Sequence, residues 1–479
     1  MELTKKLALT ILVFFSLTFS LISLGKWAFN DADEGIYAEV YYESVQRNNF
    51  LNFTYLKTPW AEKPPLLFWL MRGSALVFGE NEFSLRLPSA ILSAASVVLV
   101  FLIVLVATNN LVASFLSGLV LLTTAYFWFT GRQVRMDVPV TASILLCFYS
   151  FLKARKHSKW FLVFGFGLAC GVLFKSVIGL LIYPVILIYS WFYKDWSWLK
   201  NKWFWLGNLL ALVLTAPWHI YESIIYGQKF WHSYLVLHVV DRALTTVTSG
   251  PVAPFFYYFN QILITNQPWF LLFLIIGISF LVYLYRRGVK NRKFELFLMV
   301  CSFFILVLFY VPKTRLLYYF TPMLPFMAMF IGSVTTRLIE RRKNLVIACF
   351  AVVASVGLIN TTLRIFSQKD RGFFLEDTKK ISRTVVAEDE RKVIQIASEK
   401  NLDLYLYNWN FYATLSYYAT IHNDVKLKIY KNDVKMDPPC LLLIPTPLVE
   451  KIQIQTAHKI LFRGEAATLV EIFSAQKLF

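Results

Sequence analysis

The chain has 479 residues, of which 57% are hydrophobic and 17% aromatic, while only 16% are charged. Together with a mean hydropathy of +0.55, this composition excludes an ordinary soluble globular domain. The formal net charge of +19 arises largely from Lys and Arg clusters between apolar segments. No nucleic-acid-binding motif accompanies these clusters, so we expect them to set membrane orientation, with no nucleic acid as partner.

Apolar segments recur along the first three quarters of the chain. About 20 helical residues cross a hydrocarbon core, so we predict an all-α polytopic membrane protein with about eleven transmembrane helices. The predicted spans are 7–24, 84–106, 111–130, 138–152, 160–174, 176–193, 203–226, 267–285, 294–311, 316–336 and 344–362. The first is predicted to be an uncleaved anchor, because no small-residue cleavage site follows its apolar core.

Basic residues gather in alternate loops, which predicts the orientation of the chain. These loops are 153–159, 194–202, 286–293 and 337–344. The positive-inside rule places them and the N-terminus in the cytoplasm, which predicts a multi-pass protein of the cytoplasmic (inner) membrane. The stretches predicted to lie outside are 25–83, a short loop around 131–137, 227–266 and the tail after about 363.

The first external stretch is too long to be a simple connection. It opens with the acidic run NDADEGIYAEV at 30–40, and helical spacing of the aromatic residues that follow predicts a helix along the membrane interface. A second juxtamembrane helix is predicted to begin at Pro64 and Pro65 and to stop at Gly79, because proline suits a first helical turn and glycine a helix end.

The tail is predicted to be a small extracytoplasmic α/β domain, 363–479, that follows a transmembrane domain over 1–362. The sequence predicts strands at 392–398, 402–408, 425–430 and 440–445, and helices at 411–420 and 447–455. No glycine-rich phosphate loop is present, so we expect no nucleotide cofactor. We expect the tail to aid acceptor docking or stability without supplying catalytic groups.

Carboxylates and cations are predicted to share the outer face of the membrane, which suits a phosphate-bearing substrate and a group to be deprotonated. Each candidate also has a structural alternative. Asp33 and Asp137 can each cap a helix, and Lys63 and Lys175 can extend along apolar surface to the interface. A lone histidine such as His238 is more often structural than a ligand.

Two further cations, Lys313 and Arg315, lie in the segment VPKTRLLYYFTPMLP. They are predicted to lie outside, against the positive-inside trend, which makes a phosphate partner more plausible. The predicted donor-phosphate ligands are therefore Lys63, Lys175, Lys313 and Arg315.

Four motifs, DADEGIYAEV, EKPPLLFWL, RMDVP and KTRLLYYFTPMLP, together resemble those of the membrane-embedded C-type (GT-C) glycosyltransferases. The resemblance is to the bacterial aminoarabinose transferase and its protein O-mannosyltransferase relatives, which include the dolichyl-phosphate-mannose-protein mannosyltransferase type. It covers roughly residues 1–340. It implies an enzyme, surrounded by membrane lipids, that moves a sugar from a polyprenyl-phosphate donor to a lipid A-like lipid or a protein outside the cytoplasmic membrane.

The resemblance also implies roles for individual residues. Asp33 matches the catalytic acid of the first external loop, Glu34 is its neighbour in the same motif, and Asp137 matches the second acid. Glu62 and Lys63 match a pair near the metal and the carrier phosphate.

His238 falls near a family histidine linked to metal binding, although Leu237 stands where the family often has glutamate. A divalent metal ion is therefore a candidate cofactor, and whether it is required stays open. Ile36 stands where aminoarabinose transferases carry a phosphate-binding arginine, which leaves Lys63, Lys313 or Arg315 for that role.

A single displacement at the anomeric carbon predicts inversion, with Asp33 as the base for a hydroxyl acceptor. The alternatives are a transporter or flippase of a lipid-linked saccharide, or a non-catalytic scaffold. Transporters usually place ionisable residues at mid-membrane and often show repeated halves, whereas here the acids lie at span ends and no repeat is found. The enzyme prediction requires Asp33, Asp137, Glu62 and Lys63 to border one cavity.

Overall fold

The computed structural model describes residues 2–29, 31–241, 244, 255–289, 292–340, 342–367, 373–375, 379–381, 383–409, 413–421, 425–430, 436–449 and 456–474. These residues form two compact units. We call the first the helical unit, made of 1–22, 61–70 and 87–366, and the second the mixed unit, made of 23–60, 71–86 and 367–479. The domain boundary predicted between 362 and 363 stays a prediction.

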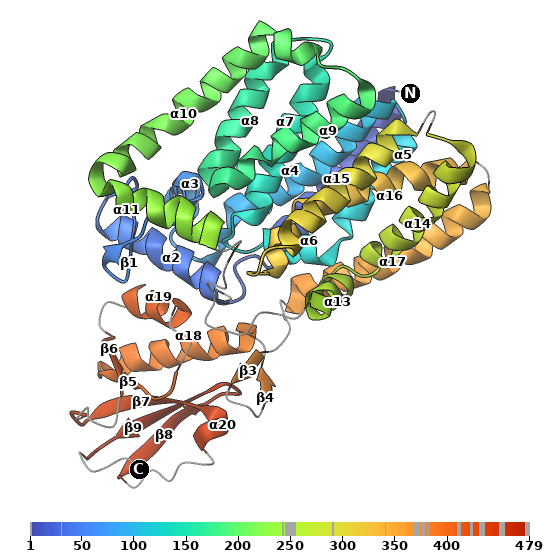
Figure 1. Cartoon of the computed structure of the whole chain (residues 1–479). Helices are drawn as coiled ribbons and strands as arrows, with labels where there is room; N and C mark the ends of the chain where they lie inside the picture. The colour runs from blue at the N-terminus through green and yellow to red at the C-terminus, as the bar shows by residue number, and fades with distance from the viewer. Residues whose placement is uncertain are drawn as a thin grey trace. The chain divides into compact units, whose positions relative to one another are not determined.

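The predicted fold class, a helical multi-span membrane protein with a small α/β tail, is confirmed (Figure 1). Eight helical segments in the described residues are long and apolar enough to cross a membrane, and nine if one bent pair counts as a span. Six of these eight are the single helices α1 (Glu2–Leu21), α4 (Glu82–Thr108), α7 (Asp137–Ala154), α10 (Lys202–Tyr226), α14 (Trp269–Arg287) and α15 (Lys293–Tyr310). A seventh is α17 (Lys343–Ser367).

The eighth segment, 160–193, was predicted to be two spans, and it turns back on itself. It consists of α8 (Trp160–Lys175), η1 (Ser176–Leu181) and α9 (Ile182–Tyr193). The ring centroids of Phe164 and Tyr183 are 6.3 Å apart, whereas a continuous helix would separate these positions by about 28 Å. Dividing this segment into two raises the eight segments to nine. Adding the bent pair and the 17-residue α16 (Met323–Ile339) gives the eleven predicted spans.

The bent pair, α5 (Leu111–Leu122) and α6 (Ala125–Gly131), changes direction by 63°. Arg132 follows directly and is 1% exposed. Its guanidinium donates to the carbonyl oxygens of Phe19 at 2.5 Å, Ser20 at 2.9 Å and Ile22 at 2.6 Å, the unpaired acceptors at the end of α1. This basic residue of the predicted external loop therefore has a structural role.

Both helices predicted in the first external stretch are confirmed as α2 (Asp31–Gln46) and α3 (Leu66–Phe78). Gly79 follows α3 with a φ of +77°, a left-handed conformation that glycine adopts without the cost of a Cβ atom. A short hairpin of β1 (Thr54–Tyr55) and β2 (Thr58–Pro59) lies between the two helices and was not predicted.

The tail contains a five-stranded mixed sheet in the order β6-β5-β7-β9-β8. β5 pairs in parallel with β6 and β7, whereas β9 is antiparallel to β7 and β8. The strands are β5 (Leu404–Leu406), β6 (Leu427–Ile429), β7 (Cys440–Pro445), β8 (His458–Arg463) and β9 (Ala467–Ile472), with a separate hairpin of β3 (Phe373–Leu375) and β4 (Lys379–Ile381). The tail helices are α18 (Arg383–Lys400), α19 (Ala413–Ile421) and α20 (Thr446–Val449).

The strand predicted at 392–398 is wrong, because this segment lies inside α18. Its fully buried residues are Val393, Ile394 and Ala397, and this spacing puts them on one face of a helix. β8 and β9 were not predicted. The helix predicted at 447–455 overlaps α20, and its last six residues lie outside the described residues.

The remaining short elements connect the longer helices. They are η2 (Ser197–Lys200), α11 (Gln228–Trp231), the π-helix η3 (His232–Asp241), α13 (Phe255–Thr265) and η4 (Leu317–Phe320).

Candidate active site

The predicted catalytic pair, Asp33 and Glu34, lies in the first turn of α2, and the two side chains have different surroundings. Asp33 is partly exposed, while Glu34 is 0% exposed. Both carboxylate oxygens of Glu34 accept from Arg86, Oε1 from Nε at 2.7 Å and Oε2 from Nη2 at 3.0 Å. Of the two acids, Asp33 is therefore the more accessible to a substrate, because the carboxylate of Glu34 is buried in its pair with Arg86.

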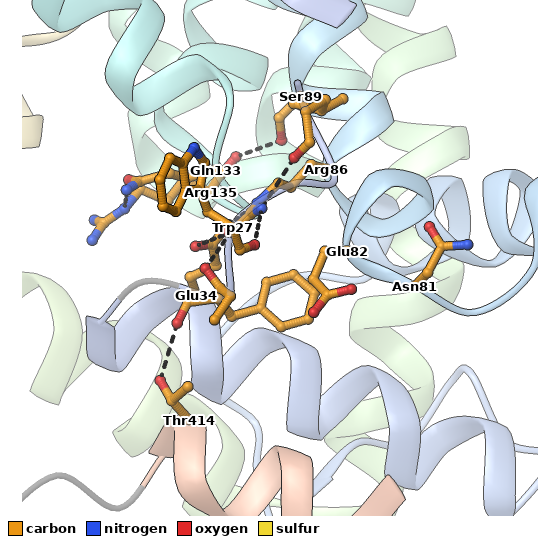
Figure 2. Close-up of polar contacts among 12 residues, drawn as sticks. Trp27, Glu34, Asn81, Glu82, Arg86, Ser89, Gln133, Arg135 and Thr414 are labelled. Atoms are coloured by element: carbon orange, nitrogen blue, oxygen red, sulfur yellow. Dashed lines mark hydrogen bonds and ion pairs between the residues drawn. The ribbon is translucent and has the colours of Figure 1, made fainter. Parts of the chain in front are cut away.

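Arg86 also fixes the backbone that leads into α2 (Figure 2). Its guanidinium donates to the carbonyl oxygens of Leu24 at 3.0 Å, Trp27 at 2.7 Å and Ala28 at 2.9 Å. Its side chain is 0% exposed and lies over the ring of Phe29, 5.0 Å from the centroid. A buried guanidinium with this many acceptors is well compensated, so the Glu34–Arg86 pair holds the segment before Asp33 in one conformation.

The second predicted acid, Asp137, is the first residue of α7 and is paired with Lys175, the last residue of α8. The exposed fractions of the two side chains are 6% and 16%. The ammonium of Lys175 also lies 5.4 Å and 5.3 Å from the ring centroids of Tyr318 and Tyr319. Two predicted site residues from distant parts of the sequence are thus brought together in the helical unit.

Arg135 adds a second cation to this cluster. Its guanidinium carbon lies 4.4 Å from the centroid of the Tyr318 ring. Nε donates to Oε1 of Gln133 at 2.8 Å, and Ser89 donates to the carbonyl oxygen of Arg135 at 3.1 Å (Figure 2). We call Arg135, Asp137, Lys175, Tyr318 and Tyr319 the cation–tyrosine cluster. Its two cations and one carboxylate suit a phosphate-bearing ligand.

Glu62 and Lys63 lie just before α3, where Pro64 and Pro65 are buried. Lys63 donates to the carbonyl oxygen of Glu62 at 3.3 Å, and its ammonium is 3.9 Å from the Glu62 carboxylate. The Lys63 side chain is 13% exposed. This ammonium is consequently held beside the backbone and does not extend freely into solvent.

The two cations from VPKTRLLYYFTPMLP differ in their surroundings. Lys313 is exposed and forms no ion pair with any described residue. Arg315 is partly buried, and its Nε donates to the carbonyl oxygens of Tyr310 at 3.0 Å and Pro312 at 3.2 Å. Arg315 therefore binds carbonyl groups at the end of α15, so part of its hydrogen-bonding capacity is already used.

The candidate metal ligands from the sequence are Glu62 and His238. Among the described side chains, no group of three or more His, Cys, Asp or Glu residues is arranged to hold a metal ion. The carboxylate of Glu62 has the ammonium of Lys63 beside it, and this charge disfavours a divalent cation. His238 lies in η3, but its side chain is outside the described part of the structure. The described side chains around Glu62 therefore do not fit a metal ion.

A further acid of the first motif, Glu39, is 1% exposed and faces α19. Its Oε1 accepts from the hydroxyl of Thr420 at 2.9 Å. The pKa of Glu39 is raised to about 7, chiefly by burial, with the Thr420 hydroxyl acting to lower it and the nearby charge of Glu43 to raise it. Glu39 therefore titrates near neutral pH, unlike an ordinary surface carboxyl group.

The predicted site residues fall in both units. Asp33 and Glu34 belong to the mixed unit, whereas Glu62, Lys63, Asp137, Lys175, Lys313 and Arg315 belong to the helical unit. The single cavity predicted for Asp33, Asp137, Glu62 and Lys63 therefore stays a prediction.

Sequence reasoning missed Arg86 and the roles of Arg135 and Tyr318. A charged residue inside an apolar run, as in FSLRLPS, implies a buried partner. That pattern could have singled out Arg86, but it would not have identified Glu34 as its partner.

Comparison with known proteins places these features in a family context. Residues 62–221 match the family model for dolichyl-phosphate-mannose-protein mannosyltransferase. The chain is 26% identical over 343 residues to an undecaprenyl phosphate-alpha-4-amino-4-deoxy-L-arabinose arabinosyl transferase of Aeromonas hydrophila, which covers 69% of this chain and 60% of that protein. A Proteus mirabilis protein of the same name is 27% identical, over 67% of this chain and 57% of its own length.

Two solved structures share the fold. ArnT from Cupriavidus metallidurans, bound to undecaprenyl phosphate, matches with a TM-score of 0.72 and 17% identity over 96% of this chain and 97% of its own. The archaeal oligosaccharyltransferase AglB from Archaeoglobus fulgidus matches with a TM-score of 0.57 and 13% identity, over 89% of this chain and 64% of its own. The resemblance predicted from the four motifs is confirmed.

Proposed function

We propose that this chain transfers a sugar from a polyprenyl-phosphate donor to a lipid A-like acceptor on the outer face of the cytoplasmic membrane. The proposal is supported by its similarity to the aminoarabinose transferases and mannosyltransferase-like GT-C membrane glycosyltransferases. The relatives are named for undecaprenyl-phosphate-linked aminoarabinose. The chain spans 60% of the length of the first of these relatives.

The geometric observation that carries the proposal is the cation–tyrosine cluster. Lys175 is paired with Asp137 and lies beside two tyrosine rings, with Arg135 over one of them. The side chain of Lys175 is 16% exposed, whereas that of Asp137 is buried, and in the proposed mechanism a phosphate replaces the carboxylate as the partner of Lys175. Developing negative charge on a departing phosphate is stabilised by fixed cations of this kind.

In this mechanism Asp33 takes the proton from an acceptor hydroxyl, whose oxygen forms a bond to the anomeric carbon of the donor sugar. The bond between that carbon and the phosphate oxygen breaks, and polyprenyl phosphate leaves with both bonding electrons. One displacement inverts the anomeric configuration. If the acceptor is a phosphate, Asp33 positions the acceptor and transfers no proton.

Lys63 is a second candidate for the donor phosphate, because its ammonium is largely shielded from water and charge-assisted hydrogen bonds are stronger where water is excluded. Glu34 supports the mechanism indirectly, through its pair with Arg86.

The proposal is tested with the full chain in lipid vesicles and a polyprenyl-phosphate donor labelled in the sugar. Parallel samples carry a lipid A-like phosphoglycolipid or a peptide rich in Ser and Thr. We expect label on the glycolipid and release of polyprenyl phosphate. Label on the peptide would assign a protein acceptor, and movement of the intact lipid-linked sugar across the membrane without transfer would support the transporter alternative.

A further inference from the structure

The segment before Asp33 is anchored by the tail as well as by Arg86. The backbone N–H of Ala28 donates to Oε1 of Glu388 at 2.6 Å, and the backbone N–H of Phe29 donates to the hydroxyl of Tyr418 at 3.0 Å. Ala28 and Phe29 are both 0% exposed with the tail in place, so in the folded protein these two donors depend on the tail groups for their hydrogen bonds. Leaving such donors unpaired is costly.

The two tail acceptors are themselves linked through one carboxylate. Tyr418 donates its hydroxyl proton to Oε1 of Glu82 at 2.9 Å, and Arg391 donates to the same oxygen at 3.3 Å. Arg391 also donates to Oε2 of Glu388 at 2.6 Å. A closed chain of hydrogen bonds thus runs from the N–H of Phe29 through Tyr418, Glu82, Arg391 and Glu388 to the N–H of Ala28.

The carbonyl side of the same segment is held by Arg86 and by a further tail residue. Arg86 binds the carbonyl oxygens of Trp27 and Ala28 (Figure 2). The hydroxyl of Thr414, in α19, lies 3.4 Å from the carbonyl oxygen of Phe29. Two consecutive peptide units are therefore fixed on both their N–H and C=O sides. Such double anchoring leaves the segment little freedom to shift.

α2 itself is anchored on the other side of Asp33. A Cβ atom added to Gly35 would lie 2.7 Å from the backbone nitrogen of Thr414 and 2.9 Å from its hydroxyl oxygen. α2 and α19 thus approach at a point where only glycine fits. Asp33 lies four residues after Phe29 and two before Gly35, so it stands between two contacts with the tail.

We propose that the tail positions the catalytic carboxylate of Asp33, with Tyr418 as the main positioning residue and Glu388 and Arg391 as supporting ones; this inference rests on the proposed function. A general base must be held within hydrogen-bond reach of its proton, and a displacement of about 1 Å can reduce the rate about 100-fold. The tail then acts on the turnover step, beyond any contribution to acceptor docking or stability.

The test uses Tyr418→Phe, which removes the hydroxyl and keeps the ring that packs on Phe29. Tyr417→Phe is the matched control, because this adjacent hydroxyl takes no part in the chain of hydrogen bonds. With the full chain in vesicles, we expect Tyr418→Phe to lower kcat about 10- to 100-fold with little change in KM for the donor. Tyr417→Phe should leave both constants unchanged.

A double-mutant cycle separates positioning from general stability. If Tyr418 acts through Asp33, adding Tyr418→Phe to Asp33→Asn should produce little further loss. Unchanged kcat in Tyr418→Phe, or an equal loss with and without Asp33, would overturn the inference. If Tyr418→Phe accumulates poorly, Arg391→Gln replaces it, since Arg391 is 35% exposed. Absence of sugar transfer by the unaltered chain would instead refute the proposed function.

Discussion

The mixed unit and the helical unit each contain an ion pair between a carboxylate in the first turn of a helix and a cation far along the chain. In the Glu34–Arg86 pair both side chains are 0% exposed, and five hydrogen bonds from the guanidinium are made to protein acceptors. In the Asp137–Lys175 pair the side chains are 6% and 16% exposed. The first pair has no guanidinium donor left for a ligand, whereas the second is the pair for which we propose exchange of the carboxylate for a phosphate.

This contrast shows that charge and sequence position alone do not distinguish a structural ion pair from a functional one. Burial and the number of acceptors already bound decide the difference. The comparison assigns Glu34 and Arg86 to support of the segment before Asp33. It also favours Lys175 over Arg315 as a phosphate ligand, because Arg315 already binds two carbonyl oxygens.

The largest predicted effect on stability concerns the buried pair. Arg86→Met should leave the Glu34 carboxylate and three carbonyl oxygens without their donor, at a cost of about 3–5 kcal/mol of unfolding free energy. Thermal unfolding of the full chain in detergent measures this loss of unfolding free energy. Arg72→Met is the control, because Arg72 forms a partly exposed ion pair with Glu80. A loss below about 1 kcal/mol, the range of surface pairs, would contradict the structural assignment.

The next effect is pH-dependent and concerns Glu39. Its folded-state pKa of about 7 lies above the ordinary value of 4.5, so its ionisation destabilises the mixed unit as pH rises from about 4.5 to 7. Glu39→Gln keeps a side-chain acceptor for Thr420 and removes the charge. We expect the variant to equal the wild type below pH 4.5 and to exceed it above pH 7 by at most about 3 kcal/mol.

Unfolding of the wild type and of Glu39→Gln at pH 4 and at pH 8 measures the difference in their stability. A stability difference that does not change between the two pH values would show that burial does not perturb Glu39 in the way its contacts indicate.

A smaller effect should distinguish the exchangeable pair. Lys175→Ala is expected to raise KM for the polyprenyl-phosphate donor about tenfold or more, because a hydrogen bond to a charged group contributes about 1.5–3 kcal/mol. Lys156→Ala, in a loop predicted to be cytoplasmic, is the control for loss of one positive charge. An unchanged KM in Lys175→Ala would return Lys175 to the interface-anchoring role considered from the sequence.

The smallest predicted effect lies at the end of α3. Gly79→Ala places a Cβ atom on a residue with a φ of +77°, where the nearest neighbour is 3.7 Å away. The cost is therefore backbone strain alone, about 1–2 kcal/mol. Gly73→Ala is the control, because Gly73 lies inside α3 with open space around it. This change should be neutral or slightly stabilising. Thermal unfolding temperatures of the two variants are compared. Equal unfolding temperatures would remove the helix-end role of Gly79.

The sequence was informative wherever one local rule governed the outcome. Length and apolar content predicted the spans, and Pro64 and Gly79 predicted the limits of α3. Asp137 and Lys175 were both singled out, but their contact depends on the reversal at Ser176, where η1 begins, and no local pattern specified that turn. β-Branched residues favoured a strand at 392–398, and tertiary packing favoured α18.

The contacts between tail and first external stretch were not predictable for a different reason. Phe29 and Tyr418 are 389 residues apart in the chain, and neither belongs to a motif with catalytic chemistry. A tyrosine in an α/β tail has many structural roles, so its residue type carried no specific prediction. Only the fold identified the hydrogen bond between them.

The central claim is that Asp33 is the base in sugar transfer. The most direct measurement is the single-turnover rate of the Asp33→Asn variant. The assay uses vesicles with a labelled polyprenyl-phosphate sugar and a hydroxyl acceptor. Asp195→Asn, whose side chain is 27% exposed, serves as the control. We predict a rate about 10²–10⁴-fold below the wild type, with unchanged protein level and donor binding. A near-normal rate in Asp33→Asn would remove Asp33 from the mechanism and leave it as a helix-capping residue.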